Sequence, residues 1–187
     1  MTNLVRARST PPTGHSHERG TWQDGGLAEK LRLRRGVRAV VLDDQDRVLL
    51  VRFEATLPLH DVTRLWATPG GGVEDDRQAL ARELAEEVGL HAPAVGPLIW
   101  TRTHVAPMST GHDGQHENFY LVRTARFEPK PALTTEQLRA ENVAGLAWWT
   151  VDELAAAEAV FAPRRLPELV SALVVPGPPD RAVDTGV

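Results

Sequence analysis

The sequence predicts an α+β layered fold, for three reasons. With 187 residues the chain is long enough for one ordinary domain and short for two. Its composition, 42% hydrophobic and 25% charged, is typical of a globular protein. Apolar runs with strand character outnumber helical segments and do not alternate with them regularly, which favours a layered fold over a doubly wound sheet.

Strands are expected wherever short apolar, β-branched runs are bounded by polar or turn residues. The runs at 36–42 and 47–53 are separated by "DDQD", which predicts a hairpin with a short polar loop. Four further segments have the same character: "RLWATP" (64–69), "AVGPLIWTRTHV" (94–105), "HENFYLVRTARF" (116–127) and "VAGLAWWT" (143–150). Together these runs predict the sheet.

The first helix is expected to begin at Asp75 or Asp76 and to stop at Gly89. Asp75 and Gln78 have capping-box spacing, and glycine commonly ends a helix in the left-handed conformation. A helical period predicts that one stripe of this segment is buried: Leu80, Leu84 and Val88, flanked by Ala81 and Ala85.

Two more helices are expected near the C-terminus. Thr150 and Glu153 have capping-box spacing before "VDELAAAEA", and "RRLPELVSALVV" has Pro167 near its start. Residues 1–30 and 176–187 are rich in turn-forming residues without apolar periodicity, and we expect a flexible arm and a flexible tail there.

Composition excludes several classes of function. The chain has no cysteine, so disulfides, thiolate metal sites and cysteine nucleophiles are excluded. A formal net charge of -4 gives no support for a broad nucleic-acid-binding surface. No apolar run has the length needed to span a bilayer, so we expect a cytoplasmic protein without a membrane partner.

The first helix is crowded with carboxylates. Glu83, Glu86 and Glu87 lie beside its apolar stripe, and the like-charge pair Glu83–Glu87 costs about 0.2–0.5 kcal/mol. Divalent cations would reverse this repulsion, because magnesium binds through a few carboxylates plus substrate phosphates. The preceding glycines, Gly70, Gly71 and Gly72, suit a loop whose backbone approaches an anionic ligand. These residues alone predict a site for metal and phosphate.

The segment "RELAEEVGL", Arg82 to Leu90, resembles the end of the Nudix hydrolase box. That pattern is a Gly, five residues, a Glu, seven residues and then R-E-U-x-E-E-x-G-U, with U an aliphatic residue. Glu74 has the required spacing before Arg82, but the position of the box glycine holds Thr68. The glycine loop is about three residues shorter than in many members, so Glu74 either combines two family glutamates or is the earlier of them.

The resemblance implies an α/β/α sandwich around a mixed sheet, over about residues 35–172. It implies a metal-dependent pyrophosphohydrolase that cleaves a nucleoside diphosphate linked to another group, with magnesium or manganese activating the attacking water. Carried over, the metal ligands are Glu83, Glu86, Glu87 and Glu74, and the catalytic group is Glu86, Glu87 and Arg82, with Arg82 orienting a glutamate. Substrate binding falls to Gly70, Gly71, Gly72 and Arg52.

Several assignments stay open at the level of sequence. The general base is Glu86, Glu117 or Glu141, the last two being equally consistent with exposed carboxylates. Arg52 and Arg64 could bind phosphates. Six aromatic residues could stack a base or build the core: Trp66, Trp100, Phe119, Tyr120, Trp148 and Trp149.

The expected substrate is a nucleoside triphosphate, a nucleotide sugar or a dinucleotide, and the expected assembly includes a possible homodimer. The alternative function is a catalytically inactive Nudix-fold module that binds nucleotides or regulates. A same-fold isomerase of isoprenoid diphosphates would need a cysteine, which the chain lacks.

Overall fold

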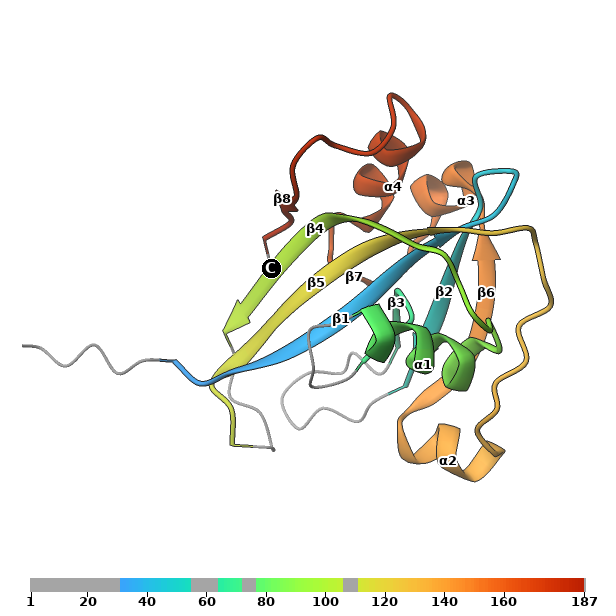
Figure 1. The fold of residues 1–187 in the computed structure, drawn as a ribbon, viewed down its shortest axis with the longest axis vertical. Coiled ribbons are helices and arrows are strands. Elements are labelled where there is room, and N and C mark those ends of the chain that lie inside the picture. Colours follow the sequence, from blue (N-terminus) through green and yellow to red (C-terminus); the bar gives the residue numbers. More distant parts are fainter. Residues whose placement is uncertain (1–30, 55–63, 72–76, 106–110, 187) are drawn as a thin grey trace, which may run out of the picture. The chain divides into compact units, whose positions relative to one another are not determined.

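The computed structural model describes residues 31–54, 64–71, 77–105 and 111–186, and these residues form one mixed sheet with helices (Figure 1). The strands are β1 (Leu33–Leu42), β2 (Val48–Phe53), β3 (Leu65–Ala67), β4 (Val95–Val105), β5 (Gly114–Arg123), β6 (Val143–Trp149), β7 (Phe161–Ala162) and β8 (Val183–Asp184). The helices are α1 (Arg77–Val88), α2 (Thr135–Ala140), α3 (Val151–Ala156) and α4 (Leu166–Val174).

The sheet has the order β7-β3-β2-β1-β5-β4-β8, and β6 pairs with β2 outside this path. Strands β1 and β5 are parallel over their whole length, whereas β4 and β5 are antiparallel. The expected hairpin of β1 and β2 is present and antiparallel, with Leu42 opposite Val48. The mixed sheet expected from the sequence is therefore confirmed.

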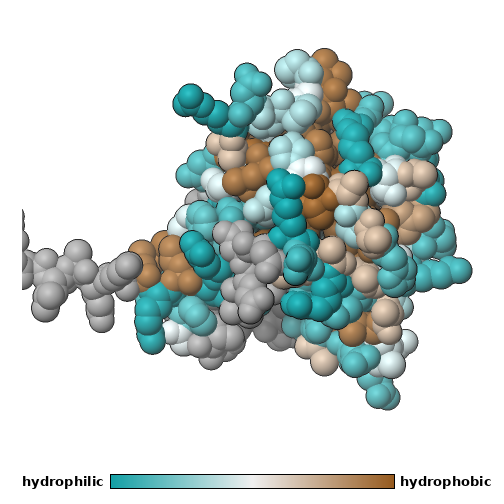
Figure 2. All heavy atoms as spheres, viewed as in Figure 1, coloured by the Kyte–Doolittle hydropathy of each residue, from teal (hydrophilic) through white to brown (hydrophobic). Residues whose placement is uncertain are grey.

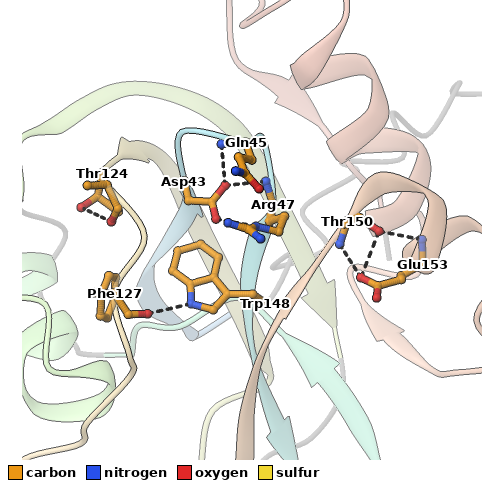
Figure 3. Close-up of polar contacts among 9 residues, drawn as sticks. Asp43, Gln45, Arg47, Thr124, Phe127, Trp148, Thr150 and Glu153 are labelled. Atoms are coloured by element: carbon orange, nitrogen blue, oxygen red, sulfur yellow. Dashed lines mark hydrogen bonds and ion pairs between the residues drawn. The ribbon is translucent and has the colours of Figure 1, made fainter.

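The turn between β1 and β2 is organised by the buried side chain of Asp43 (Figure 3). Its carboxylate accepts hydrogen bonds from the Gln45 N–H at 2.8 Å, the Arg47 N–H at 3.0 Å and the Arg47 Nε at 2.7 Å. The "DDQD" loop thus satisfies its own donors with a side chain, as Asp does in many turns.

Alternating strand residues build a separate hydrophobic cluster on each face of the sheet. Val37, Ala39 and Val41 of β1 face α1, which contributes Leu80, Leu84 and Val88. Val40 and Leu42 face the other way, toward a cluster that includes Leu154 of α3 and four residues of α4, Leu166, Leu169, Val170 and Leu173. Because successive side chains of a strand point to opposite faces, one run of apolar residues supplies both cores.

Helix α1 agrees with the predicted stripe at its three large residues and differs at its alanines. Leu80, Leu84 and Val88 are buried, as expected, but the buried alanine is Ala79, whereas Ala81 and Ala85 are only partly covered. The helix ends at Gly89, which has a φ of 76°, and the Leu90 N–H returns to the Leu84 carbonyl at 3.0 Å. This is the predicted glycine stop.

Capping boxes begin two of the helices. At α3 the Thr150 side chain accepts from the Glu153 N–H, and the Glu153 carboxylate accepts from the Thr150 N–H, as expected (Figure 3). Helix α2 is an addition to the prediction and has the same device, formed by Thr134 and Gln137.

The C-terminal segment differs from the expected flexible tail at residues 183–185. Strand β8 pairs in parallel with β4, with Val183 opposite Trp100. Thr185 is 2% exposed, and its N–H donates to the Thr101 carbonyl at 2.9 Å. These hydrogen bonds extend the sheet by one short strand at this edge.

Figure 2 shows hydrophilic side chains over much of the face in view, with hydrophobic ones between them. The exposed large aliphatic residues are Leu31, Val105, Val160, Val175 and Val183. Among the described helices, none is both long enough and apolar enough to cross a bilayer.

Candidate functional site

The three glutamates of α1 differ in burial. Glu87 is 8% exposed, the Glu83 side chain is 19% exposed, and Glu86 is exposed to solvent. Residues 83 and 87 are four apart, so they lie on one side of the helix, next to the buried Leu80 and Leu84. The structure thus brings Glu83 and Glu87 together at the inner edge of α1 and leaves Glu86 toward solvent.

Gly70 and Gly71 pack directly against the two covered glutamates. The Gly70 N–H donates to the Glu87 carboxylate at 2.7 Å. A Cβ atom added to Gly71 would lie 3.1 Å from a carboxylate oxygen of Glu83, closer than most side chains tolerate. The glycines therefore allow the backbone to approach these two carboxylates, whereas the approach that the sequence predicts is to an anionic ligand.

The environment of Glu87 disfavours its charge. Burial raises the pKa of Glu87 to about 7, against the hydrogen bond from Gly70 and the charge of Arg38, which lower it. The neighbouring carboxylates Glu83 and Glu141 contribute to this rise of the Glu87 pKa. A cation placed here would relieve both the desolvation and the repulsion.

Glu83 shares this environment, and Glu141 joins it from the turn after α2. Burial, followed by the charge of Glu86, raises the pKa of Glu83, and Glu141 adds to the rise. Glu141 thus acts electrostatically on both Glu83 and Glu87. Of the two candidate bases outside α1, it is the one that lies near the carboxylate pair.

Glu117, the other candidate, is neither exposed nor part of this group. It is 2% exposed, and its carboxylate contacts Arg38 Nε at 2.8 Å and an Arg102 terminal nitrogen at 2.7 Å. Burial would raise the pKa of Glu117, but the two guanidinium groups lower it overall. A carboxylate held in this way is a poor proton acceptor.

Arg82 is the residue expected to orient a glutamate, and Thr68 stands at the position of the box glycine. The Arg82 guanidinium is 58% exposed and lies 3.9 Å from a Glu83 carboxylate oxygen. Thr68 is fully buried, and its hydroxyl has no hydrogen-bond partner among the described residues. The predicted site residues Gly72 and Glu74, and the predicted cap Asp75 or Asp76, lie outside the described residues.

A cavity of about 480 Å³ lies between the end of β2, helix α2 and the first half of β6. Its polar lining includes Arg52, Glu54, Arg139 and Asn142. Arg139 and Asn142 lie close to Glu141 in the sequence, on either side of it. The Arg52 guanidinium donates to the Ala144 carbonyl at 3.1 Å, and its Nε has no hydrogen-bond partner among the described residues.

Arg64 does not line this cavity. It lies 3.1 Å from the carboxylate of Glu54, which Arg52 approaches at 3.8 Å. Of the two arginines proposed from the sequence for phosphate binding, Arg52 is the one at the cavity.

The six aromatic residues considered from the sequence all pack on the cores. Trp100 and Phe119 are buried in one cluster, and Trp66 and Trp149 pack against it. Tyr120 and Trp148 pack against the other cluster. Of the two roles considered for these aromatic residues, base stacking and core packing, the structure shows core packing.

A family model for the NUDIX domain matches residues 32–169. The chain belongs to the NUDIX domain family. The match covers nearly the same range as the domain expected from the sequence, 35–172, and includes α1 with its glutamates.

Several solved structures share this fold. The E. coli ORF135 protein is 25% identical with a TM-score of 0.51, over 80% of this chain and 96% of that one. The NUDIX domain of Shewanella oneidensis NrtR, complexed with ADP ribose, is 20% identical with a TM-score of 0.55, over 76% and 89%.

A MutT NUDIX hydrolase from Burkholderia pseudomallei is 24% identical with a TM-score of 0.53, over 73% of this chain and 97% of that one. These likenesses confirm the fold class predicted from the sequence. A search of curated proteins finds no match.

The carboxylates of the NUDIX domain fit a hard divalent cation. No group of three or more His, Asp or Glu residues suited to a metal ion occurs within the described ranges. Magnesium, however, is commonly held by one or two carboxylates plus water and substrate phosphates. Glu83 and Glu87 are two partly or fully buried carboxylates side by side, which fits this kind of coordination.

Proposed function

We propose that this NUDIX protein is a pyrophosphohydrolase that uses magnesium or manganese and cleaves a nucleoside diphosphate linked to a second group. The observation that supports it most is the covered pair Glu83 and Glu87, held against Gly70 and Gly71. Burying two like charges side by side is unfavourable in a protein without a counter-ion. A bound cation would neutralise the two carboxylates, and the diphosphate would complete its coordination.

The α1 carboxylates have distinct roles in this proposal. Glu83 and Glu87 would hold the cation, with Glu74 as a further ligand, and Glu86 would contribute a ligand or a water contact. When bound, the cation neutralises diphosphate oxygens and lowers the pKa of the attacking water. Arg82, beside Glu83, would orient that carboxylate.

Glu86 and Glu141 are the candidates for the general base. Glu86 is exposed and Glu141 acts on both covered glutamates, so each could accept a proton from water near the site. Glu117 is a poor candidate because its carboxylate is ion-paired with two arginines, which lower its pKa.

The second group of the substrate would occupy the cavity between β2, α2 and β6. Its volume of about 480 Å³ is in the usual range for small ligands. Arg52 and Arg139 offer positive charge for phosphate, and Asn142 offers an amide. Leu138, Val143 and Leu146 provide apolar contact. This lining suits a nucleoside triphosphate, a nucleotide sugar or a dinucleotide.

A substrate screen with metal tests the proposal. We expect magnesium- or manganese-dependent release of a nucleoside monophosphate from at least one nucleoside triphosphate, nucleotide sugar or dinucleotide, with pyrophosphate as the second product from a triphosphate. Glu87→Gln and Glu86→Gln should each lower turnover of the best substrate by about 100-fold or more. Glu128→Gln, which changes an exposed carboxylate outside the site, is the matched control and should keep full turnover.

Wild-type turnover in both glutamine variants would contradict the site. Ligand binding without turnover of any compound would instead favour the alternative, a catalytically inactive nucleotide-binding or regulatory module.

A further inference from the structure

Three charged side chains form a row across neighbouring strands of the sheet. Glu117 of β5 lies between Arg38 of β1, at 2.8 Å, and Arg102 of β4, at 2.7 Å. Glu117 is 2% exposed, and each arginine side chain is 17% exposed. Arg102 is directly opposite Glu117 in the β4–β5 pairing. The row is thus a nearly buried ion-pair network within the sheet.

A buried ion-pair network of this kind is not expected to stabilise the fold more than apolar residues would. Desolvating three charged groups costs free energy, and apolar residues of similar volume often stabilise such positions equally well. The neighbouring residues on the same face, Val40 and Phe119, are apolar members of the core. The two arginines differ, however, in their contacts outside the network.

Arg38 differs from Arg102 by reaching the glycine segment. Besides its bond to Glu117, its guanidinium donates to the carbonyls of Thr68, at 3.4 Å, and of Gly70. Arg102 is ion-paired with Glu117 at 2.7 Å, and the backbone polar groups of Gly70 are instead bound by Arg38 and Glu87. Arg38 thus connects the buried Glu117 to the backbone beside α1.

Both backbone polar groups of Gly70 form hydrogen bonds with side chains. Its carbonyl accepts from Arg38, and its N–H donates to the Glu87 carboxylate at 2.7 Å. Its φ is 122°, and an added Cβ would lie 2.5 Å from the Val37 carbonyl oxygen. The residue therefore has little freedom to move while these contacts persist.

We infer that Arg38 is a positioning residue for the cation site, acting through Gly70 on Glu87. Glu117 fixes one edge of the guanidinium fork, and the remaining donors fix the carbonyl side of Gly70. The Gly70 N–H consequently stays aimed at Glu87 and sets the orientation of that carboxylate. This inference rests on the proposed function, in which Glu87 holds the cation.

The matched variants Arg38→Met and Arg102→Met separate positioning from ion pairing. Each removes one guanidinium from Glu117, but only Arg38→Met removes the contact with Gly70. In the metal-free protein, we expect the Gly70 amide to exchange with solvent at least about tenfold faster in Arg38→Met than in Arg102→Met. Manganese affinity, measured by electron paramagnetic resonance, should fall about 10- to 100-fold in Arg38→Met only.

Arg38→Lys keeps a positive charge beside Glu117 but lacks the planar fork that reaches two acceptors at once. It should show the same two changes, and it serves as the test variant if Arg38→Met does not fold. Equal amide exchange and equal manganese affinity in the Arg38 and Arg102 variants would overturn the inference.

Glu87→Gln distinguishes this failure from failure of the proposed function. If Glu87→Gln loses manganese binding while the Arg38 and Arg102 variants behave alike, only the positioning role is wrong. If Glu87→Gln binds manganese as the wild type does, the metal assignment is wrong. The exchange rate of the Gly70 amide then still decides whether Arg38 positions that peptide.

Discussion

Gly70 is the residue at which fold and site meet. Its carbonyl is bound by Arg38, its N–H by Glu87, and its backbone conformation is one that side-chain-bearing residues rarely adopt. The segment that contains it is also hydrogen-bonded to the β1 backbone on both sides of Arg38. One glycine thus links the strand, the buried ion pair and the carboxylates of α1.

Gly70→Ala should destabilise the protein more than its backbone conformation alone explains. An added Cβ would lie 2.5 Å from the Val37 carbonyl and 3.0 Å from the Arg38 Cα, so the backbone must shift. We expect a loss of about 3 kcal/mol or more in the free energy of unfolding, measured by urea denaturation.

Gly177→Ala is the matched control for this variant. Gly177 has nearly the same φ, 123°, but nothing within 4 Å of the added atom. It should cost only about 1 kcal/mol, the price of the backbone conformation. Equal losses in both variants would show that the contacts around Gly70 are unimportant for stability.

Sequence predicts the local part of the site and misses the long-range part. Glu83 and Glu87 are four apart on one helix, so their common side follows from helical geometry. At about 100° per residue, Glu87 also lies nearer than Glu86 to the stripe of Leu80 and Leu84, so its greater burial follows from the same geometry. Arg38 and Glu117 are 79 residues apart, and no local pattern pairs them.

Among the elements, the ones with a repeating apolar period or a known cap are predictable. The turn at 43–47, the glycine end of α1 and the capping box of α3 all follow from local chemistry. Helix α2 carries the same kind of box in "TTEQ", but it has six residues and none is buried, so no period reveals it. Strands β7 and β8 have two residues each and depend on partners elsewhere in the sheet.

The β1–β2 turn should give stability that depends on pH. Desolvation would raise the pKa of Asp43, but hydrogen bonds from Arg47 and Gln45 lower it overall. A carboxyl whose pKa is lower in the folded state stabilises that state above its unfolded pKa of about 4, and this contribution is lost as the pH falls through the folded value. Asp43→Asn should therefore cost about 1–2 kcal/mol at pH 7 and less below about pH 4.

Asp44→Asn is the control for this measurement. It makes the same change of charge at an exposed position of the same turn. Chemical denaturation of the wild type and both variants at pH 7 and at pH 3.5 should show a pH-dependent difference for Asp43→Asn only. A difference for Asp43→Asn that does not change with pH would rule out the charge of Asp43 as its source.

At the scale of the whole domain, the candidate metal site is part of the packing of α1. Leu80, Leu84 and Val88 pack on one face of the sheet, while Glu83 and Glu87 lie on the edge of the same helix. The charges that disfavour the metal-free site therefore act on a helix that one of the two cores needs. Binding a cation should relieve that cost and stabilise the folded domain as a unit.

Manganese should consequently raise the melting temperature of the protein. A ligand at about 100 times its dissociation constant stabilises the folded state by about 2.7 kcal/mol, which is about 5–10 °C for a domain of this size. The double variant Glu83→Gln, Glu87→Gln should melt above the metal-free wild type, because it removes the repulsion, and should not respond to manganese. Differential scanning calorimetry with sodium chloride at matched ionic strength separates binding from charge screening. The same rise in the double variant would mean that the cation stabilises the domain from another place.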